Sequence, residues 1–268
     1  MFSEENAAAG VTFARGFKAA GVKAGIKKSG NLDLAMIYTE KEASVAGVFT
    51  QNAVAAAPVI VSREVVKTGS AHAIVANAGC ANACTGEVGL ANAHKMAALA
   101  AEELGCKADD VLVGSTGIIG VNLPMDKLAA GIKAAAAELS EDGSKNAGNA
   151  IITTDTYSKA CSTEVEIGGK AVRFGAIAKG SGMIQPNMAT MLCYITTDAN
   201  ISSQLMQKAL SEIVEVTFNM ISVDGDMSTN DTVLVLANGE SGMAEIQADT
   251  TEYDKFCEVL GNMCRELS

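Results

Sequence analysis

The sequence predicts a mixed α/β fold in which sheets are layered with helices. Short runs rich in Val and Ile are bounded by turn residues, longer segments repeat apolar residues every three or four positions, and the two kinds alternate along the chain. With 268 residues, 49% of them hydrophobic, the chain is long enough to bury a large core. Because aromatic residues make up only 4% and Trp is absent, that core must be mainly aliphatic and methionine side chains.

The first third of the chain is predicted to be mostly β-sheet. Four short runs have strand-like composition: Leu32–Tyr38, Ser44–Thr50, Pro58–Ser62 and Ala73–Ala76. The next segment, Glu87–Leu104, is predicted to be a helix, because its apolar residues fall on one helical face and Gly105 follows as a C-cap.

Strands and helices alternate through the rest of the sequence. Val-rich or alternating runs predict strands, and helical periodicity predicts the remaining helices. The expected elements are a strand at Asp110–Gly114, a helix at Met125–Leu139, a hairpin of Cys161–Ile167 and Ala171–Ala178 turned at Gly168-Gly169, a helix at Ser203–Phe218, a strand at Asp231–Ala237 and a helix at Thr251–Leu267 with Thr251 and Asp254 at capping-box spacing. No repeat and no low-complexity linker marks a domain boundary.

Composition excludes several classes of function. The chain has 31 acidic and 20 basic residues and a formal net charge of −11, so it lacks the basic surface that binds nucleic acid. The longest apolar run, Ala53–Val61, is far shorter than the ~20 residues of a membrane helix, and the first residues are acidic where a signal peptide is basic. We expect a soluble cytoplasmic protein with no nucleic-acid or membrane partner.

Metal binding is not expected either. The seven cysteines contain no C-x-x-C pair, and His72 and His94 are the only histidines, so we expect reduced thiols and no zinc site. The segment from Asp224 to Asp231 begins like a calcium loop, but Thr229 stands where the loop needs Gly and Val235 where it needs Glu. The sequence therefore predicts no metal and no cofactor.

Two glycine-containing segments are candidates for chemistry. In Gly114-Ser-Thr-Gly-Ile-Ile-Gly120 a predicted strand ends in a turn whose backbone N–H groups suit an anion or oxyanion, although a plain strand–helix connection is the simpler interpretation. The segment from Lys179 to Leu192 combines a lysine, a Gly-x-Gly bend, Pro186 and an isolated threonine between two strand-like runs. It is not a phosphate loop, because its lysine precedes the glycines, and an ordinary turn is again the alternative.

Together with other ordered matches, these segments resemble the ornithine acetyltransferase (ArgJ) family along nearly the whole chain. The matching residues are Gly25–Lys27, Leu32–Ala35, Ala46–Thr50, Ala57–Val59, Asn82–Gly86, Ser115–Gly120, Thr153–Thr156, Lys179–Leu192 and Ser222–Asp226. The resemblance implies the ArgJ/DmpA-like N-terminal-nucleophile fold. It also implies self-cleavage between Ala189 and Thr190, giving an α chain of residues 1–189 and a β chain that starts at 190.

The same resemblance implies the reaction. Thr190 would take the acetyl group of N-acetylornithine, release ornithine and pass the acetyl group to glutamate, as a step of arginine biosynthesis. Cleavage frees an α-amino group with an ordinary pKa of ~7.7–8.0, which suits a general base for the Thr190 hydroxyl. The resemblance places Thr116 and Gly117 at the oxyanion, and Lys179, Thr153 and Thr154 with Thr190 at the substrate.

The resemblance further implies a heterotetramer of two α and two β chains, with acetyl-CoA as an optional acetyl donor. Cys80 stands where the family commonly has Asn, which predicts a local change in packing. Family members continue beyond the position of Ser268 with further substrate-binding residues, so we expect the 268-residue chain alone to transfer acetyl groups poorly. The alternatives are an N-terminal-nucleophile amidase or aminopeptidase, and an inactive truncated copy.

Overall fold

A computed structural model describes residues 9–180, 191–220 and 228–268. They form one eight-stranded sheet with the order β4-β3-β2-β8-β7-β6-β5, and β1 pairs with β2 off this path. The strands are β1 (Phe17–Val22), β2 (Leu34–Phe49), β3 (Ser70–Cys80), β4 (Val111–Ile118), β5 (Lys159–Ile167), β6 (Lys170–Lys179), β7 (Leu192–Thr197) and β8 (Thr232–Ala237). The helices are α2 (Ala57–Thr68), α3 (Gly86–Leu104), α4 (Met125–Ala137), α5 (Ser144–Ile151), α6 (Ser203–Glu215) and α7 (Thr251–Leu267).

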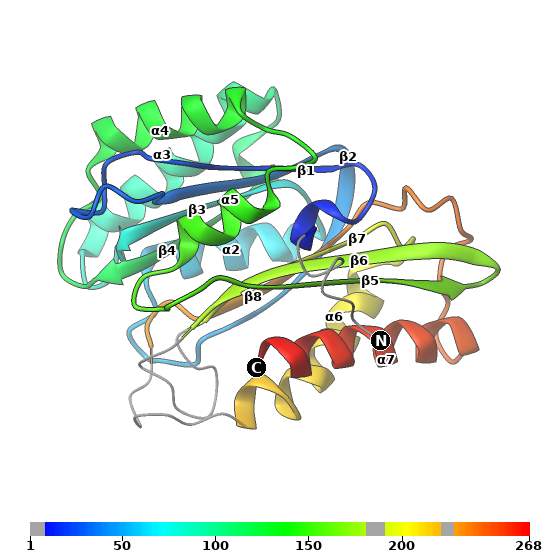
Figure 1. Cartoon of the computed structure of the whole chain (residues 1–268). Helices are drawn as coiled ribbons and strands as arrows, with labels where there is room; N and C mark the ends of the chain where they lie inside the picture. The colour runs from blue at the N-terminus through cyan, green and yellow to red at the C-terminus, as the bar shows by residue number, and fades with distance from the viewer. Residues whose placement is uncertain (1–8, 181–190, 221–227) are drawn as a thin grey trace.

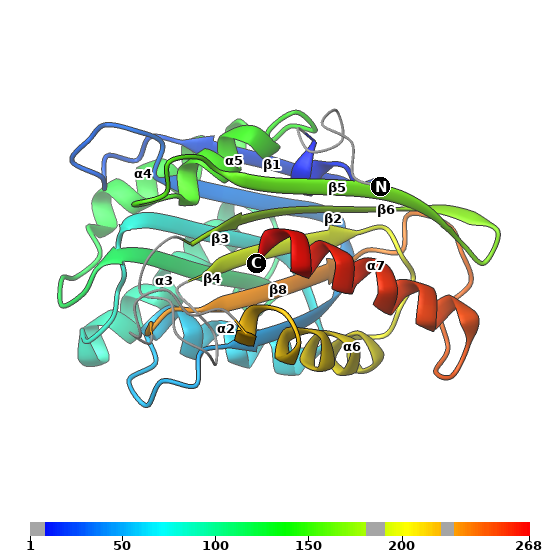
Figure 2. The same cartoon turned by 60° about the horizontal axis from the view of Figure 1, so that its bottom comes forward.

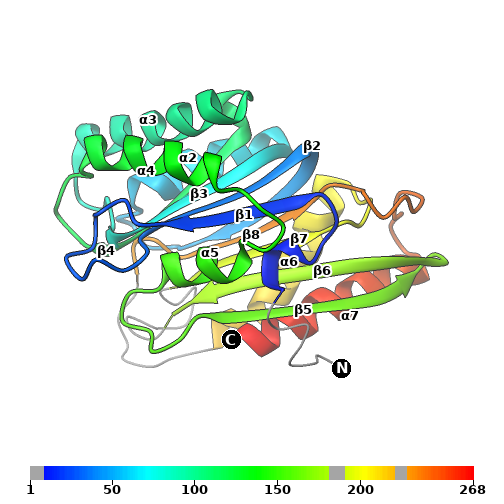
Figure 3. The same ribbon diagram turned by 45° about the horizontal axis from the view of Figure 1, so that its top comes forward.

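The helices cover the sheet on both sides. Helices α3 and α4 lie over the half of the sheet that contains β1 to β4, α7 lies over β5 in the other half, and α6 lies beside α7 and over β2, as Figures 1 and 2 show. Helix α5 packs between β1 and β6 on the inner side, which Figure 3 shows from above. The sheet curls so that the inner faces of its two halves share one buried cluster.

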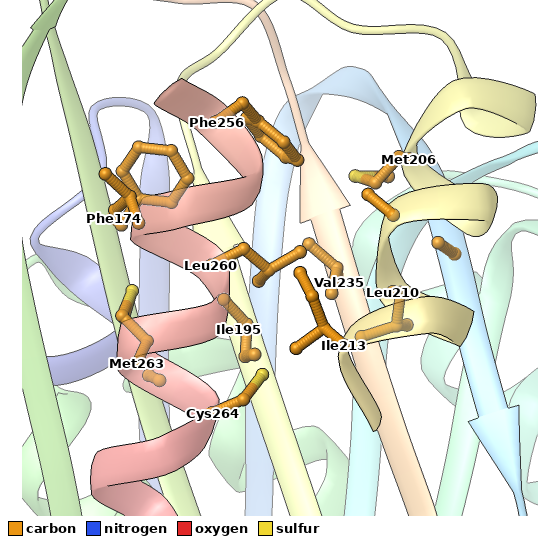
Figure 4. Close-up of a cluster of buried hydrophobic side chains, with 14 of the residues drawn as sticks. Phe174, Ile195, Met206, Leu210, Ile213, Val235, Phe256, Leu260, Met263 and Cys264 are labelled. Atoms are coloured by element: carbon orange, nitrogen blue, oxygen red, sulfur yellow. The ribbon is translucent and has the colours of Figure 1, made fainter. Parts of the chain in front are cut away.

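Alternation of side chains along each strand builds this layering. On β8, Leu234 and Leu236 belong to the inner cluster, whereas Val233 and Val235 pack outward. The outward residues meet α6 and α7 in a second cluster, where Phe174 of β6 and Phe256 of α7 have ring centroids 5.5 Å apart (Figure 4). Because β7 and β8 are buried on both faces, their sequences read as nearly continuous apolar runs.

Most of the predicted helices and the hairpin are confirmed. Helix α3 covers the predicted segment and ends at Gly105, whose φ of 72° is the left-handed conformation of a C-cap. The hairpin of β5 and β6 turns at Gly168 and Gly169, both with positive φ. Helix α7 has the predicted bounds, but its N-cap is Thr250, whose hydroxyl accepts from the N–H of Tyr253, and not the predicted Thr251.

Two strand predictions are wrong in detail. The segment Pro58–Ser62 belongs to helix α2, not to a strand: Pro58 stands in the first turn, where its missing N–H costs nothing, and Gly69 closes the helix with φ 89°. Burial of residues such as Val59, Val61 and Val65 outweighs the strand propensity of the Val-Ile-Val run. The two runs predicted before it are one long strand, β2, which shifts register between Tyr38 and Ala43 in its pairing with β3.

Strand β1 and helix α5 were not predicted, and β7 was expected only as a strand-like run after the Lys179–Leu192 segment, without bounds. Strand β1 is interrupted in sequence by Gly21, and α5 is short and begins without a capping side chain.

Within the described ranges no helix is both long and apolar enough to cross a membrane. Of the seven cysteines, all of which are described, Cys80, Cys161, Cys193 and Cys264 are buried, and each of the seven is a free thiol.

Candidate active site

The first part of the site is the turn at the end of β4. Thr116 is only 4% exposed, whereas Gly117 beside it is exposed to solvent. Gly117 has φ 133°, and a Cβ atom there would collide with the backbone of Gly79 and come within 2.7 Å of the Cys80 nitrogen. Only glycine fits this position, because the backbones of β3 and β4 come together where their parallel register shifts. Because the two backbones come so close here, Gly117 lies at the surface directly after the buried Thr116.

Lys179, the last residue of β6, joins this turn to a second loop. Its ammonium group donates to the Oγ1 of Thr116 at 3.1 Å and to the Oγ1 of Thr153 at 3.0 Å. The residue is only 3% exposed. Burial lowers the pKa of Lys179 from its usual range, and the charges of Asp155 and Asp231 oppose that decrease. A buried cation with two hydroxyl partners is thus fixed between β4 and the connection from α5 to β5.

Asp155 holds that connection against the end of β6. Its Oδ1 accepts from the N–H of Gly180 at 2.6 Å, and its Oδ2 accepts from the N–H of Thr153 at 3.2 Å. One carboxylate therefore fixes the backbone on both sides of the Lys179–Thr153 hydrogen bond. Asp155 lies inside the Thr153–Thr156 motif, but its bridging role depends on a contact 25 residues away in sequence and could not be predicted.

Buried side chains of Asn77, Ser115 and Asn230 hydrogen-bond to one another or to the backbone next to the β4 turn. The side-chain nitrogen of Asn230 donates to the carbonyl of Ala81 at 2.7 Å and to that of Ser115 at 2.8 Å. The hydroxyl of Ser115 in turn donates to Oδ1 of Asn77 at 2.7 Å. Because these donors and acceptors are buried and paired, they fix the position of the backbone on which Thr116 and Gly117 sit.

Asp231 adds a buried carboxyl group at the start of β7 and β8. Its Oδ1 accepts from the N–H of Met191 at 3.0 Å, whereas its Oδ2 is buried with no hydrogen-bond partner among the described residues. Burial raises the pKa of Asp231 to about 8, opposed by the N–H of Met191, the hydroxyl of Ser228 and the charge of Lys179. The carboxyl group of Asp231 therefore binds the backbone N–H of Met191, the residue that follows Thr190 in the sequence.

The structure brings together Thr116, Gly117, Lys179 and Thr153 from three separate segments of the chain. Thr154 adjoins Thr153 in the same loop and is exposed. The remaining predicted residues, Ala189 and Thr190, lie outside the described residues, as do Asp224 and its neighbours up to Met227.

Cys80 lies at the other side of the turn. It is buried, its thiol donates to the carbonyl of Val121 at 3.1 Å, and burial raises its pKa above the usual range. Within the described ranges, no group of three or more His, Cys, Asp or Glu side chains is arranged to hold a metal ion.

Comparison with known proteins gives a consistent result. The model of the ArgJ family matches residues 18–268. The arginine biosynthesis bifunctional protein ArgJ of Symbiobacterium thermophilum is 51% identical over 97% of this chain and 65% of its own length, and that of Lactococcus lactis is 51% identical over 95% of this chain and 63% of its own. The chain therefore spans slightly less than two thirds of the length of these relatives.

Solved structures agree with the sequence comparison. The structure of ornithine acetyltransferase from Mycobacterium tuberculosis in complex with ornithine has a TM-score of 0.63 and 40% identity, covering 69% of this chain and 97% of that chain. An L-aminopeptidase D-Ala-esterase/amidase of Ochrobactrum anthropi, described as a variant of the Ntn hydrolase fold, has a TM-score of 0.58 over the whole of this chain and 85% of its own. Its identity is only 11%, so this likeness concerns the fold alone. On the sequence match over residues 18–268, the chain belongs to the ArgJ family.

Proposed function

We propose that this chain carries the nucleophile, its general base and the oxyanion contacts of a glutamate N-acetyltransferase. Such an enzyme moves an acetyl group from N2-acetyl-L-ornithine to L-glutamate. The observation that carries the proposal is the Lys179 ammonium group, buried and bound to the hydroxyls of Thr116 and Thr153. Membership of the ArgJ family and the 51% identity to two bifunctional arginine biosynthesis proteins support it. We place the reaction in arginine biosynthesis and in the cytoplasm.

The proposal begins with self-cleavage between Ala189 and Thr190. The cut would divide the protein into an α chain of residues 1–189 and a β chain beginning at Thr190, with two copies of each in the active assembly. It would free the α-amino group of Thr190, whose ordinary pKa of ~7.7–8.0 lets it act as a base near neutral pH. Nucleophile and base would then belong to one residue, as in other N-terminal nucleophile chemistry.

In the first half-reaction, the Oγ of Thr190 would attack the acetyl carbonyl carbon while the α-amino group takes the hydroxyl proton. The tetrahedral intermediate carries an oxyanion, which we assign to Thr116 and Gly117. A threonine hydroxyl that accepts from Lys179 still has its own proton to donate, so the Thr116 hydroxyl can serve the oxyanion while it stays bound to the ammonium group.

Collapse of the intermediate would break the C–N bond, and the α-ammonium group would return its proton to the departing ornithine nitrogen. An acetyl ester on Thr190 remains. The amine of glutamate then attacks this ester by the same steps in reverse, and acetyl-CoA is a second possible source of the acetyl group. Lys179, Thr153 and Thr154 are the proposed substrate contacts, with the positive charge of Lys179 suited to a substrate carboxylate.

The intact mass of the purified protein tests the first step. We expect two chains, one with Thr190 at its N-terminus, and a single uncut chain for Thr190→Ala; a T190A protein that still splits at this bond would refute self-cleavage by Thr190. The second step is tested by measuring ornithine release from N-acetylornithine with and without glutamate. Release that depends on glutamate and yields N-acetylglutamate supports transfer, whereas release of free acetate alone would indicate an amidase.

A further inference from the structure

The loop between β1 and β2 contains two of the segments that match the family, but the site described above uses no residue of it. Asp33, the last residue of this loop, is completely buried. Its Oδ1 accepts from the N–H of Ala24 at 2.6 Å, and its Oδ2 accepts from the N–H groups of Ile26 and Lys27 at 2.6 and 2.8 Å. Because hydrogen bonds to a carboxylate are roughly twice as strong as neutral ones, this one side chain fixes the backbone of residues 24–27.

The main chain of Asp33 ties the same loop to the sheet. Its N–H donates to the carbonyl of Val22 at 2.9 Å, and its carbonyl accepts from the N–H of Ala78 at 2.9 Å. The loop therefore lies beside the end of β3, next to β4, as Figure 3 shows. The position of the carboxylate is thus set relative to the strand that pairs with the turn of the candidate site.

Gly79 of β3 connects the loop to that turn. A Cβ atom on Gly79 would come within 3.2 Å of both the backbone nitrogen and the Cγ of Lys27. On its other side, a Cβ atom on Gly117 would collide with the backbone of Gly79. Gly79 is therefore packed between the loop that Asp33 fixes and the turn assigned to the oxyanion, and a shift of residues 24–27 would reach Gly117 through a single glycine.

The side chain of Lys27 connects the loop to the other half of the site. Its ammonium group donates to the carbonyl of Leu32 at 2.7 Å and to the carbonyl of Ala150 at 3.4 Å. Ala150 lies in the last turn of α5, where the final carbonyl groups of a helix lack partners within the helix. Thr153, whose hydroxyl accepts from Lys179, follows three residues later. The loop thus contacts both segments that hold the ammonium group of Lys179.

We propose that Asp33 is a positioning residue of the acetyl-transfer site, which fixes residues 24–27 and through them sets the positions of Gly117 and Thr153 relative to Lys179. Its meaning for catalysis rests on the proposed acetyl transfer, but the mechanical connection does not. Such positioning matters because a displacement of about 1 Å in an active site can lower the rate by ~10²-fold.

The first test is Asp33→Asn, followed by ¹H–¹⁵N NMR. The new NH2 group cannot accept, so at least one of the three backbone N–H groups loses its partner. We expect the Thr153 amide, which donates to Asp155, to exchange with solvent about tenfold faster than in the wild type, and the Gly117 amide resonance to shift. Asp198→Asn is the matched control, because Asp198 is also buried and accepts from backbone N–H groups, but it follows the far end of β7. A folded Asp33→Asn protein in which both amides behave as in the wild type would overturn the proposal.

The second test, Lys27→Met, separates the two connections. Methionine keeps an aliphatic side chain beside Gly79 but cannot donate to the end of α5, so Thr153 should exchange about tenfold faster while the Gly117 resonance stays in place. The carboxylate hydrogen bonds of the loop remain, so this variant is informative even where the first one fails to fold. Lys255→Met on α7 is the control. Exchange of Thr153 at the wild-type rate in Lys27→Met would overturn the proposal.

Kinetics supply a readout that loss of stability alone would not produce. Lys27→Met should raise KM for N-acetylornithine with kcat retained, whereas Asp33→Asn should also lower kcat by about tenfold, because it reaches the oxyanion turn as well. Unchanged kcat and KM in Asp33→Asn would overturn the positioning role. The NMR measurements need no catalysis, so absence of acetyl transfer in the wild type would refute the proposed function and leave the connection through the loop testable.

Discussion

The ammonium nitrogen of Lys179 lies 3.1 Å from Oγ1 of Thr116, although β6 and β4 are separated by four strands in the order of the sheet. The contact exists because the sheet curls and the inner faces of its two halves share one core. It follows that the candidate site depends on the tertiary fold: neither half of the sheet contains it alone.

Replacement of Lys179 should separate function from stability. A charge-assisted hydrogen bond contributes ~1.5–3 kcal/mol, so we expect Lys179→Ala to lower kcat/KM for acetyl transfer by about 10- to 100-fold. Circular dichroism should show a retained fold. Lys255→Ala is the control, because Lys255 pairs with Glu258 on the exposed side of α7. Unchanged kinetics in Lys179→Ala would remove Lys179 from the site.

Gly117→Ala should disrupt the β4 turn. The added methyl group would overlap the backbone of Gly79, and its φ of 133° is unfavourable for any residue with a side chain, so we expect a loss of stability on the order of 1–3 kcal/mol together with a loss of activity. Gly120→Ala is the matched comparison: φ there is also positive, at 78°, but no atom of the described residues that surround it lies within 4 Å of the new Cβ. Thermal unfolding of both variants checks this. Equal effects would mean that crowding at Gly117 is unimportant.

Asn230→Asp should weaken the support of the same turn. A carboxylate cannot donate the hydrogen bonds that Asn230 gives to Ala81 and Ser115, so two buried carbonyl groups lose their partner. Each such loss costs about 1–3 kcal/mol, and we expect a clear decrease in the urea midpoint of unfolding. A midpoint within experimental error of the wild type would show that these two hydrogen bonds are dispensable.

Asp231→Asn should change how stability depends on pH. The pKa of Asp231 is raised to about 8 in the folded protein, above its value of ~3.9 in an unfolded chain, so the protein gains stability from this group below pH 4 and loses it as pH rises toward 8. Asparagine does not titrate. The melting temperature of the variant relative to the wild type should therefore rise between pH 5 and pH 8, and a constant difference would contradict a carboxyl group that titrates in this range.

Tyr194 offers a test of packing beneath the site. Its hydroxyl is buried without a partner among the described residues, and a Cβ at Gly114 would collide with it. We expect Gly114→Ala to destabilise the protein by ~1–3 kcal/mol and Tyr194→Phe to be close to neutral. Combining the two changes should recover part of the loss, as measured by a double-mutant cycle in urea. Strict additivity would mean that the two groups do not touch.

Local sequence signals explain why much of the fold could be predicted. The apolar periodicity of α3 with its closing Gly105, and the paired glycines between β5 and β6, are each contained in a few consecutive residues. The error at Pro58–Ser62 has the opposite cause: a Val-Ile-Val run suits either a strand or a buried helix, and tertiary packing decides between them. The merger of two predicted strands into β2 likewise depends on a register shift against β3.

The candidate site shows the same division. Thr116, Gly117, Thr153 and Lys179 were identified because they lie in motifs that resemble a known family. Asp155, Asn230 and Asp231 were missed as site residues, since their importance comes from contacts with residues 25 to 149 positions away. Asn230 and Asp231 directly precede β8, and nothing in the sequence around them indicates these distant contacts.

The order of strands in the sheet has one more consequence. Strands β7 and β8 follow the proposed cleavage point in sequence, yet they lie side by side between β6 and β2, which precede it. A protein cut between residues 189 and 190 would therefore consist of two polypeptides that are interlocked within a single hydrogen-bonded sheet. To separate, the two polypeptides would have to break the β6–β7 and the β2–β8 strand pairs at the same time. The cut protein should therefore migrate as one particle in native gels and unfold in one thermal transition. Its two chains should be seen separately only after denaturation.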